Sequence, residues 1–148
     1  MRQDHQLTVP GRYDQVRPIC EFVAEGARLA KFDDKTIFHI ELACDEACTN
    51  IIEHAYAGEE RGDITVSWQI NNNEFMITLT DTGQPFDPKS VPEPTTPNVT
   101  EGLTKPDNLK VGGLGLHFMK KLMDDVRFVF AGEKGNQLIM IKQLKGDT

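Results

Sequence analysis

Residues 41–56 read ELACDEACTNIIEHAY and are the most informative stretch of the chain. They lie inside a run from about residue 35 to residue 57 whose apolar positions recur every three or four residues, which predicts an amphipathic helix. One side of that helix carries Glu46, Asn50 and His54, each one turn apart. The opposite side is expected to face the core and consists of Ile37, Ile40, Cys44, Cys48, Ile51 and Ala55.

A carboxylate and a carboxamide on one helix face can act together on a substrate that carries phosphates. The amide oxygen of Asn50 is a hard ligand suited to Mg²⁺. Glu46 can accept a proton from a water or hydroxyl group next to those phosphates. Taken alone, the pair has a plain alternative, because Glu and Asn four residues apart are usually just part of a solvated helix face.

Cys44 and Cys48 have the same four-residue spacing. A metal or redox pair is one reading of two thiols on a helix, but both positions fall on the apolar side, which favours packing in the core. With Cys20 the chain has three cysteines. Their small, odd number without tight pairing does not indicate a disulfide framework.

A second motif, Asp81-Thr82-Gly83, ends a strand predicted over residues 74–80. A buried carboxylate at a strand end can accept a hydrogen bond from the exocyclic amine of adenine, and Gly83 lets the backbone approach a flat ring closely. One alternative is a simple turn. Another is an aspartic-protease loop, which would need a dimer because the chain holds no second copy of the motif.

A third motif, residues 111–116 (VGGLGL), opens a predicted helix at Gly113. Free N–H groups at a helix N-terminus suit an anion such as phosphate. The spacing is not the dinucleotide-binding fingerprint, since its third glycine would fall at Phe118, and the chain contains no Walker A sequence. A glycine-rich hinge before a helix is the alternative.

The remaining periodicities predict an α+β fold. Helices that can pack on one face of hairpin-connected strands indicate a two-layer sandwich with a mixed or antiparallel sheet. The predicted strands are residues 6–9, 62–70, 74–80, 126–131 and 137–143, and the predicted helices are 13–31, 35–57 and the segment from Gly113 onward.

Residues 88–112 interrupt this regular pattern. Five of the eight prolines lie between Pro88 and Pro106, and no apolar period survives there. A loop of this length is uncommon inside a compact domain, so it is expected to be either a linker or a functional lid.

The composition is that of an ordinary globular protein, and residues 1–148 are expected to form a single domain. The formal net charge is −7, and no run of Lys and Arg occurs. This argues against binding to nucleic acid or to an anionic membrane. The chain has no apolar stretch long enough to span a bilayer and no apolar segment behind its start, so a cytoplasmic location is expected.

In combination, the three motifs and their order resemble the GHKL ATP-binding superfamily. Residues 41–56 resemble its N box, Asp81-Thr82-Gly83 its first glycine box, and residues 113–116 its second. The most specific similarity is to the small anti-sigma factor serine kinases of the RsbW and SpoIIAB type. It is carried by Glu-Ala-x-Thr-Asn followed by His54 and Tyr56, by residues 86–88 (FDP) and by residues 122–126 (LMDDV), and it covers roughly residues 5 to 143.

The resemblance implies a Bergerat-type ATP-binding fold that uses ATP and Mg²⁺ and phosphorylates a serine on a small antagonist protein. It implies Glu46 as the base, Asn50 as the Mg²⁺ ligand, and Asp81 with Gly83 at the adenine. It further implies nucleotide contacts from His54, Gly113, Leu114, Gly115 and Leu116. Lys105 and Lys110 are the candidate cations of a lid over about residues 88–112, where the family often has an arginine.

The implied partners are a STAS-type anti-sigma antagonist, a sigma factor and a second copy of the chain, with no direct contact to nucleic acid or membrane. Two alternatives stay open. The chain could be an ATP-binding interaction module without phosphotransfer, or an ATP hydrolase of the same superfamily, because the Glu-x-x-x-Asn arrangement is shared.

Overall fold

The fold is built on a five-stranded antiparallel sheet with the strand order β1-β2-β3-β5-β4. In the computed structural model, residues 5–84, 113–130 and 135–144 are described. The strands are β1 (Gln6–Pro10), β2 (Asp63–Asn71), β3 (Glu74–Asp81), β4 (Asp125–Phe130) and β5 (Asn136–Gln143). All neighbouring strands pair antiparallel, and the consecutive pairs β2–β3 and β4–β5 confirm the expected hairpin-connected strands.

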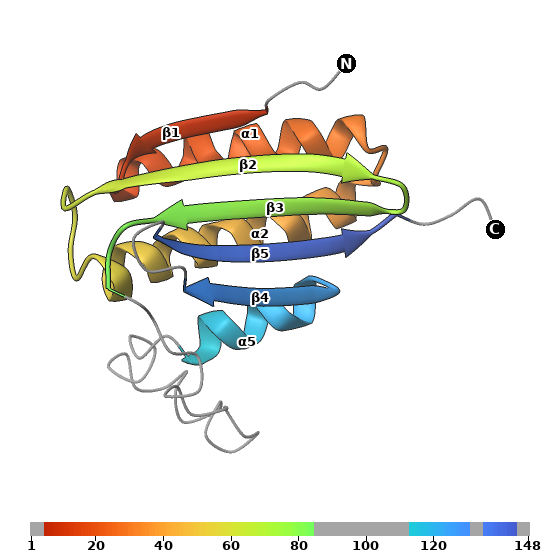
Figure 1. Cartoon of the computed structure of the whole chain (residues 1–148). Helices are drawn as coiled ribbons and strands as arrows, with labels where there is room; N and C mark the ends of the chain where they lie inside the picture. Colours follow the sequence, from red (N-terminus) through yellow and green to blue (C-terminus); the bar gives the residue numbers. More distant parts are fainter. Residues whose placement is uncertain (1–4, 85–112, 131–134, 145–148) are drawn as a thin grey trace.

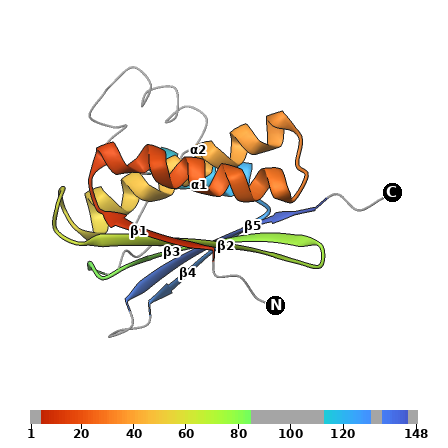
Figure 2. The ribbon, with the colours of Figure 1, turned by 90° about the horizontal axis from the view of Figure 1, so that it is seen from above.

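The described helices lie on one face of this sheet (Figures 1 and 2). They are η1 (Tyr13–Gln15), α1 (Val16–Leu29), α2 (Asp34–Asn50), η2 (Ile51–Ala55) and α5 (Gly113–Leu122). Because helices and sheet form two packed layers, the predicted α+β sandwich is confirmed.

Two of the predicted helices differ in detail from those in the structure. The first predicted helix is divided into a short 3₁₀ turn, η1, and the longer α1. The second begins as expected, since Asp33 caps it by accepting a hydrogen bond from the Thr36 amide at 2.8 Å. It does not stay α-helical to residue 57, because η2 is a π-helical turn in which the Tyr56 amide donates to the Ile51 carbonyl at 3.0 Å.

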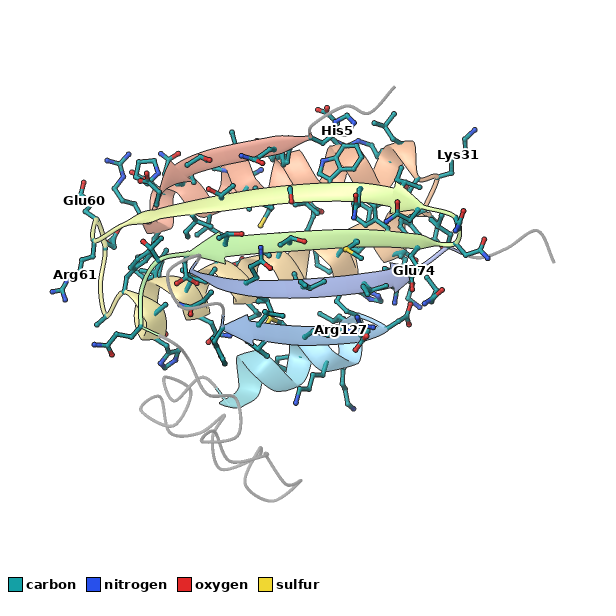
Figure 3. The ribbon with its side chains drawn as sticks, viewed as in Figure 1. His5, Lys31, Glu60, Arg61, Glu74 and Arg127 are labelled. Carbon is teal, nitrogen blue, oxygen red and sulfur yellow. The ribbon has the colours of Figure 1, made fainter. Side chains whose placement is uncertain are left out.

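The core lies between the helices and the inner face of the sheet. Alternate residues of β2, β3 and β5 point into it, as the period-two pattern predicts. Cys44 and Cys48 are fully buried and unbridged, which confirms core packing rather than a disulfide. Trp68 is buried, and the ring of His5 stacks on it with centroids 4.0 Å apart (Figure 3).

Candidate functional site

The candidate site lies where the end of β3, the beginning of β5 and the junction of α2 with η2 come together. Asp81 and Asn136 face each other in the register of β3 and β5. This is the end of the strands near which Glu60 and Arg61 lie, and Lys31 and Glu74 lie toward the other end (Figure 3). A pocket opens there, and the residues that line it include Asn50, Ile51, Ala55, Asp81, Phe128 and Asn136.

Asp81 is a buried carboxylate, only 5% exposed. Its Oδ1 atom accepts two hydrogen bonds at 2.9 Å, one from the Gly83 amide and one from Nδ2 of Asn136. Burial raises the pKa of Asp81 above its usual value, and these two donors lower that pKa in part. The carboxylate is therefore held in one orientation at the wall of the pocket.

Asn136 is the functional candidate that the sequence analysis missed. Besides Asp81, its Nδ2 atom donates to the Gly83 carbonyl at 3.0 Å, so one amide holds both ends of the Asp-Thr-Gly turn. In the sequence, Asn136 follows Gly135 between two predicted strands and carries no motif. Its only signal is that it opens the strand that pairs with the one ending at Asp81.

The turn after β3 is also fixed against η2. The Gln84 amide donates to the Ala55 carbonyl at 2.8 Å. A Cβ atom on Gly83 would lie 2.3 Å from the Ala55 oxygen, so only glycine allows this close approach. Tyr56 adds a third link, because its hydroxyl accepts from the Thr82 amide at 2.9 Å and donates to the Asp63 carbonyl at 2.6 Å.

The burial of Asn50 differs from the expectation. Asn50 was expected on the solvated side of its helix, but it is only 9% exposed. Asn50 follows the buried Ala47 by three residues and directly precedes the buried Ile51, so it lies on the border of the apolar face, beneath the pocket. Its Nδ2 atom is buried and has no hydrogen-bond partner among the described residues. An unpaired buried amide is costly, which marks a place for a polar ligand.

Glu46 lies one turn before Asn50 on α2 and is partly buried. It is not among the residues that line the pocket. Burial raises its pKa, and the nearby carboxylates of Asp45 and Glu53 raise it further. A raised pKa suits a general base at neutral pH. His54 lies on η2, partly buried, and is likewise not part of the lining.

Several expected site residues fall where the structure gives no account. Lys105, Lys110 and the expected lid over 88–112 lie outside the described residues. For Gly113, Leu114, Gly115 and Leu116 the helical backbone of α5 is described, without the side chains. The predicted start of this helix at Gly113 is confirmed.

Two further features concern metals and membranes. Within residues 5–84, 113–130 and 135–144, no group of three or more His, Cys, Asp or Glu side chains could hold a metal ion. None of the helices in this part of the chain combines the length and the apolar character needed to cross a bilayer.

Comparison with known proteins shows a matching family model and several similar relatives. The family model of the histidine kinase-like ATPase domain matches residues 9–142. A serine-protein kinase RsbW from Listeria innocua is 33% identical over 119 residues, which is 80% of this chain and 73% of that protein. The proteins of the same name from Halalkalibacterium halodurans and Bacillus subtilis are 33% and 32% identical, each over 96% of this chain and over 84% and 86% of their own length.

The family match spans most of the chain, and these relatives exceed 30% identity over at least four-fifths of it. The α+β fold, with the described helices on one face of an antiparallel sheet, is consistent with that family. The chain therefore belongs to the histidine kinase-like ATPase family, in the group of the RsbW-type serine-protein kinases.

Proposed function

We propose that this protein is an ATP-dependent serine kinase and anti-sigma regulatory factor that phosphorylates an anti-sigma antagonist protein. The observation that carries the proposal is the hydrogen-bonded arrangement of Asp81, Asn136 and Gly83 at the pocket that Asn50 also lines. It offers an oriented acceptor for an amine and a buried amide without a partner. The names of the RsbW relatives support the same activity.

ATP fits the residues that surround the pocket. Asp81 is the acceptor for the adenine amine, and the Gly83 amide orients that carboxylate by donating to its Oδ1 atom. Phe128 and Phe130 supply apolar surface for a flat base at the same pocket. The amide oxygen of Asn50 is the ligand that we assign to Mg²⁺, which would neutralise phosphate charge when bound. The buried Nδ2 atom beside it is a donor and would suit a phosphate oxygen.

Glu46 is the proposed base. Its carboxylate accepts the proton of the substrate serine, the serine oxygen forms a bond to the γ-phosphorus, and the bond from that phosphorus to the bridging oxygen of ADP breaks. The raised pKa of Glu46 makes it a stronger proton acceptor than an exposed glutamate. Lys105 or Lys110 and the first turn of α5, from Gly113 to Leu116, are the proposed triphosphate contacts.

The proposal includes the expected partners and setting. They are a STAS-type antagonist as the phosphate acceptor, a sigma factor as the regulated protein, a homodimer as the working form and the cytoplasm as the location. Residues 1–148 act as a single domain in this proposal, with residues 88–112 as the lid.

One observation favours a second candidate function. Glu46 does not line the pocket that contains Asn50 and Asp81. A protein that binds ATP and switches partners without transferring phosphate would need only Asn50 and Asp81. The two functions share the nucleotide site and differ in whether Glu46 acts on a substrate.

The test separates binding from transfer. First, calorimetric titration with ATP, with and without Mg²⁺, is expected to show micromolar binding that depends on Mg²⁺. Second, a cell extract from the source organism is incubated with the protein and γ-labelled ATP, and labelled phosphoserine peptides are identified by mass spectrometry. The wild type is expected to label a protein that Glu46→Gln does not label, although both bind ATP equally.

The matched control is Glu25→Gln, which neutralises an exposed carboxylate on α1 and should label as the wild type does. Equal labelling by Glu46→Gln would remove Glu46 as the base. ATP binding without any labelled protein would favour the binding-only function. Absence of ATP binding would contradict both.

A further inference from the structure

A groove runs along the helix layer between α1 and α2, away from the candidate nucleotide pocket. The two helices lie side by side over the sheet (Figure 2). The groove has a volume of about 540 Å³. We call it the α1–α2 groove and define it by Tyr13, Glu21, Phe38, Glu41, Leu42 and Asp45.

The apolar part of the groove consists of three large, exposed side chains. Phe38 and Leu42 lie one turn apart on α2 and are 56% and 39% exposed, and Tyr13 at the start of the α1 side is 45% exposed. Large apolar residues that are exposed singly need no explanation, but these three line one groove, and clustered exposed apolar side chains are typical of surfaces that bind partners.

The charged part of the groove is net acidic, because the carboxylates of Glu21, Glu41 and Asp45 outnumber its one lining cation, Arg17. Among its carboxylates, Glu21 is paired with Arg17, whose Nε atom lies 3.3 Å from Oε2 of Glu21. Within the described residues, no cationic group lies within ion-pair distance of Glu41 or Asp45. The groove therefore carries negative charge beside its apolar surface.

We propose that the α1–α2 groove binds an amphipathic helix of a partner protein, whose apolar ridge is flanked by Lys and Arg. The shape favours a helix, because the groove follows α2 from Phe38 to Thr49, a length of roughly 16 Å or about three helical turns. The charge favours a basic flank, which would pair with Glu41 and Asp45.

The same charges argue against a second copy of this chain as the occupant. The chain is acidic overall, with a net charge of −7. A two-fold interface would set two identical grooves against each other and bring their carboxylates together, which is unfavourable.

The groove shares a helix with the proposed kinase site. Asp45 and Thr49 on its wall directly precede Glu46 and Asn50. A helix bound here would therefore hold its protein beside the end of α2 where we place phosphotransfer. The inference does not depend on phosphotransfer, since the groove and its charge are independent of what Glu46 does.

The probe for this inference is a synthetic fluorescein-labelled peptide of about four helical turns. It carries Leu on one face and Lys on both flanks, and a matched peptide carries Glu in place of Lys. Fluorescence anisotropy is expected to show binding of the Lys peptide only, weakened by added salt. Phe38→Ala/Leu42→Ala and Glu41→Gln/Asp45→Asn are each expected to weaken binding about tenfold or more.

Matched control variants lie outside the groove. Leu29→Ala removes an exposed leucine of α1, and Glu25→Gln/Glu74→Gln neutralises two carboxylates elsewhere; both should bind the Lys peptide within about twofold of the wild type. Thermal unfolding checks the fold of each variant. Calorimetric titration with ATP checks the proposed function separately, because loss of ATP binding would contradict that function and leave the peptide result unchanged.

Three results would overturn the inference. The first is equal binding of the Lys and Glu peptides. The second is unchanged affinity in Phe38→Ala/Leu42→Ala. The third is self-association of the wild type in sedimentation that this double variant abolishes, which would make a second copy of the chain the occupant.

Discussion

At the scale of single residues, the orientation of the Asp81 carboxylate depends on Gly83 and Asn136. Both hydrogen bonds that the described residues donate to Asp81 end on Oδ1. Oδ2 is thereby presented as the acceptor for an amine such as that of adenine. In the proposed function, Asn136 is a positioning residue, because it would act on the nucleotide through Asp81.

We predict that Asn136→Ala weakens ATP binding roughly ten- to hundredfold, the effect of removing a hydrogen bond to a charged group. Asn136 lowers the pKa of Asp81, so its loss raises that pKa further. Binding needs the ionised carboxylate and is lost as the pH falls through this pKa. The variant should therefore lose ATP affinity at a higher pH than the wild type, as measured by calorimetric titration across the acidic range.

The control for this prediction is Gln143→Ala at the far end of β5, which should leave the pH profile unchanged. A purely structural role of Asn136 would lower affinity equally at every pH. A profile that keeps its wild-type midpoint in Asn136→Ala would thus contradict the positioning role.

At the scale of elements, much of the fold could be predicted from the sequence. The spacing of apolar residues within a strand or helix shows which of its faces is buried. Ile64, Val66 and Trp68 alternate on β2, and all three are buried as that alternation predicts. The motif at Asp81 could be placed for the same reason, since it follows directly where the alternation of β3 ends.

Two features of the site could not be predicted from local patterns. The π-helical turn at Ile51–Ala55 covers too few residues for its period to differ visibly from that of an α-helix. The bond between Asn136 and Asp81 joins residues 55 positions apart and depends on strand register, which single-sequence periodicity does not give. The burial of Asn50 follows from the same tertiary context.

The contact between α1 and β2 leads to a prediction about the stability of the fold. A Cβ atom on Gly26 would lie 2.4 Å from the ring of Trp68, so the helix can approach the sheet only at a glycine. Gly26→Ala gains about 1 kcal/mol of helix propensity. Overpacking a buried ring costs about 1–3 kcal/mol. The clash is severe and the ring rigid, so we expect a net loss of about 1–2 kcal/mol in the free energy of unfolding, measured with urea.

Two comparisons support this reading of the contact. Glu25→Ala, at an exposed position beside Gly26, should change the free energy of unfolding by less than about 0.5 kcal/mol. Introducing Gly26→Ala into a Trp68→Leu background should remove most of its penalty, because the smaller side chain leaves room for the methyl group. A Gly26→Ala protein that is more stable than the wild type would show that the helix can shift.

At the scale of the whole molecule, the candidate nucleotide site joins parts of the chain that are distant in sequence. Its residues come from α2, η2, β3, β4 and β5, so a ligand bound there contacts most of the fold. A ligand that binds only the folded state stabilises it according to its concentration and affinity. The stability of the molecule should therefore report on nucleotide binding.

We predict that Mg-ATP at about one hundred times its dissociation constant raises the midpoint of thermal unfolding by roughly 5–10 °C, which corresponds to about 2.7 kcal/mol in a chain of this size. Asp81→Asn should show almost none of this shift.

In the free protein, burial raises the pKa of Asp81 above its value in the unfolded chain. Protonation of Asp81 therefore stabilises the folded state fully below about pH 3.9, and this stabilisation is lost as the pH rises through the raised pKa. At neutral pH, Asp81→Asn without ATP should therefore unfold at the same or a higher temperature than the wild type. A variant that melts lower without ATP, yet keeps the full shift with it, would show that Asp81 supports the fold and not the nucleotide.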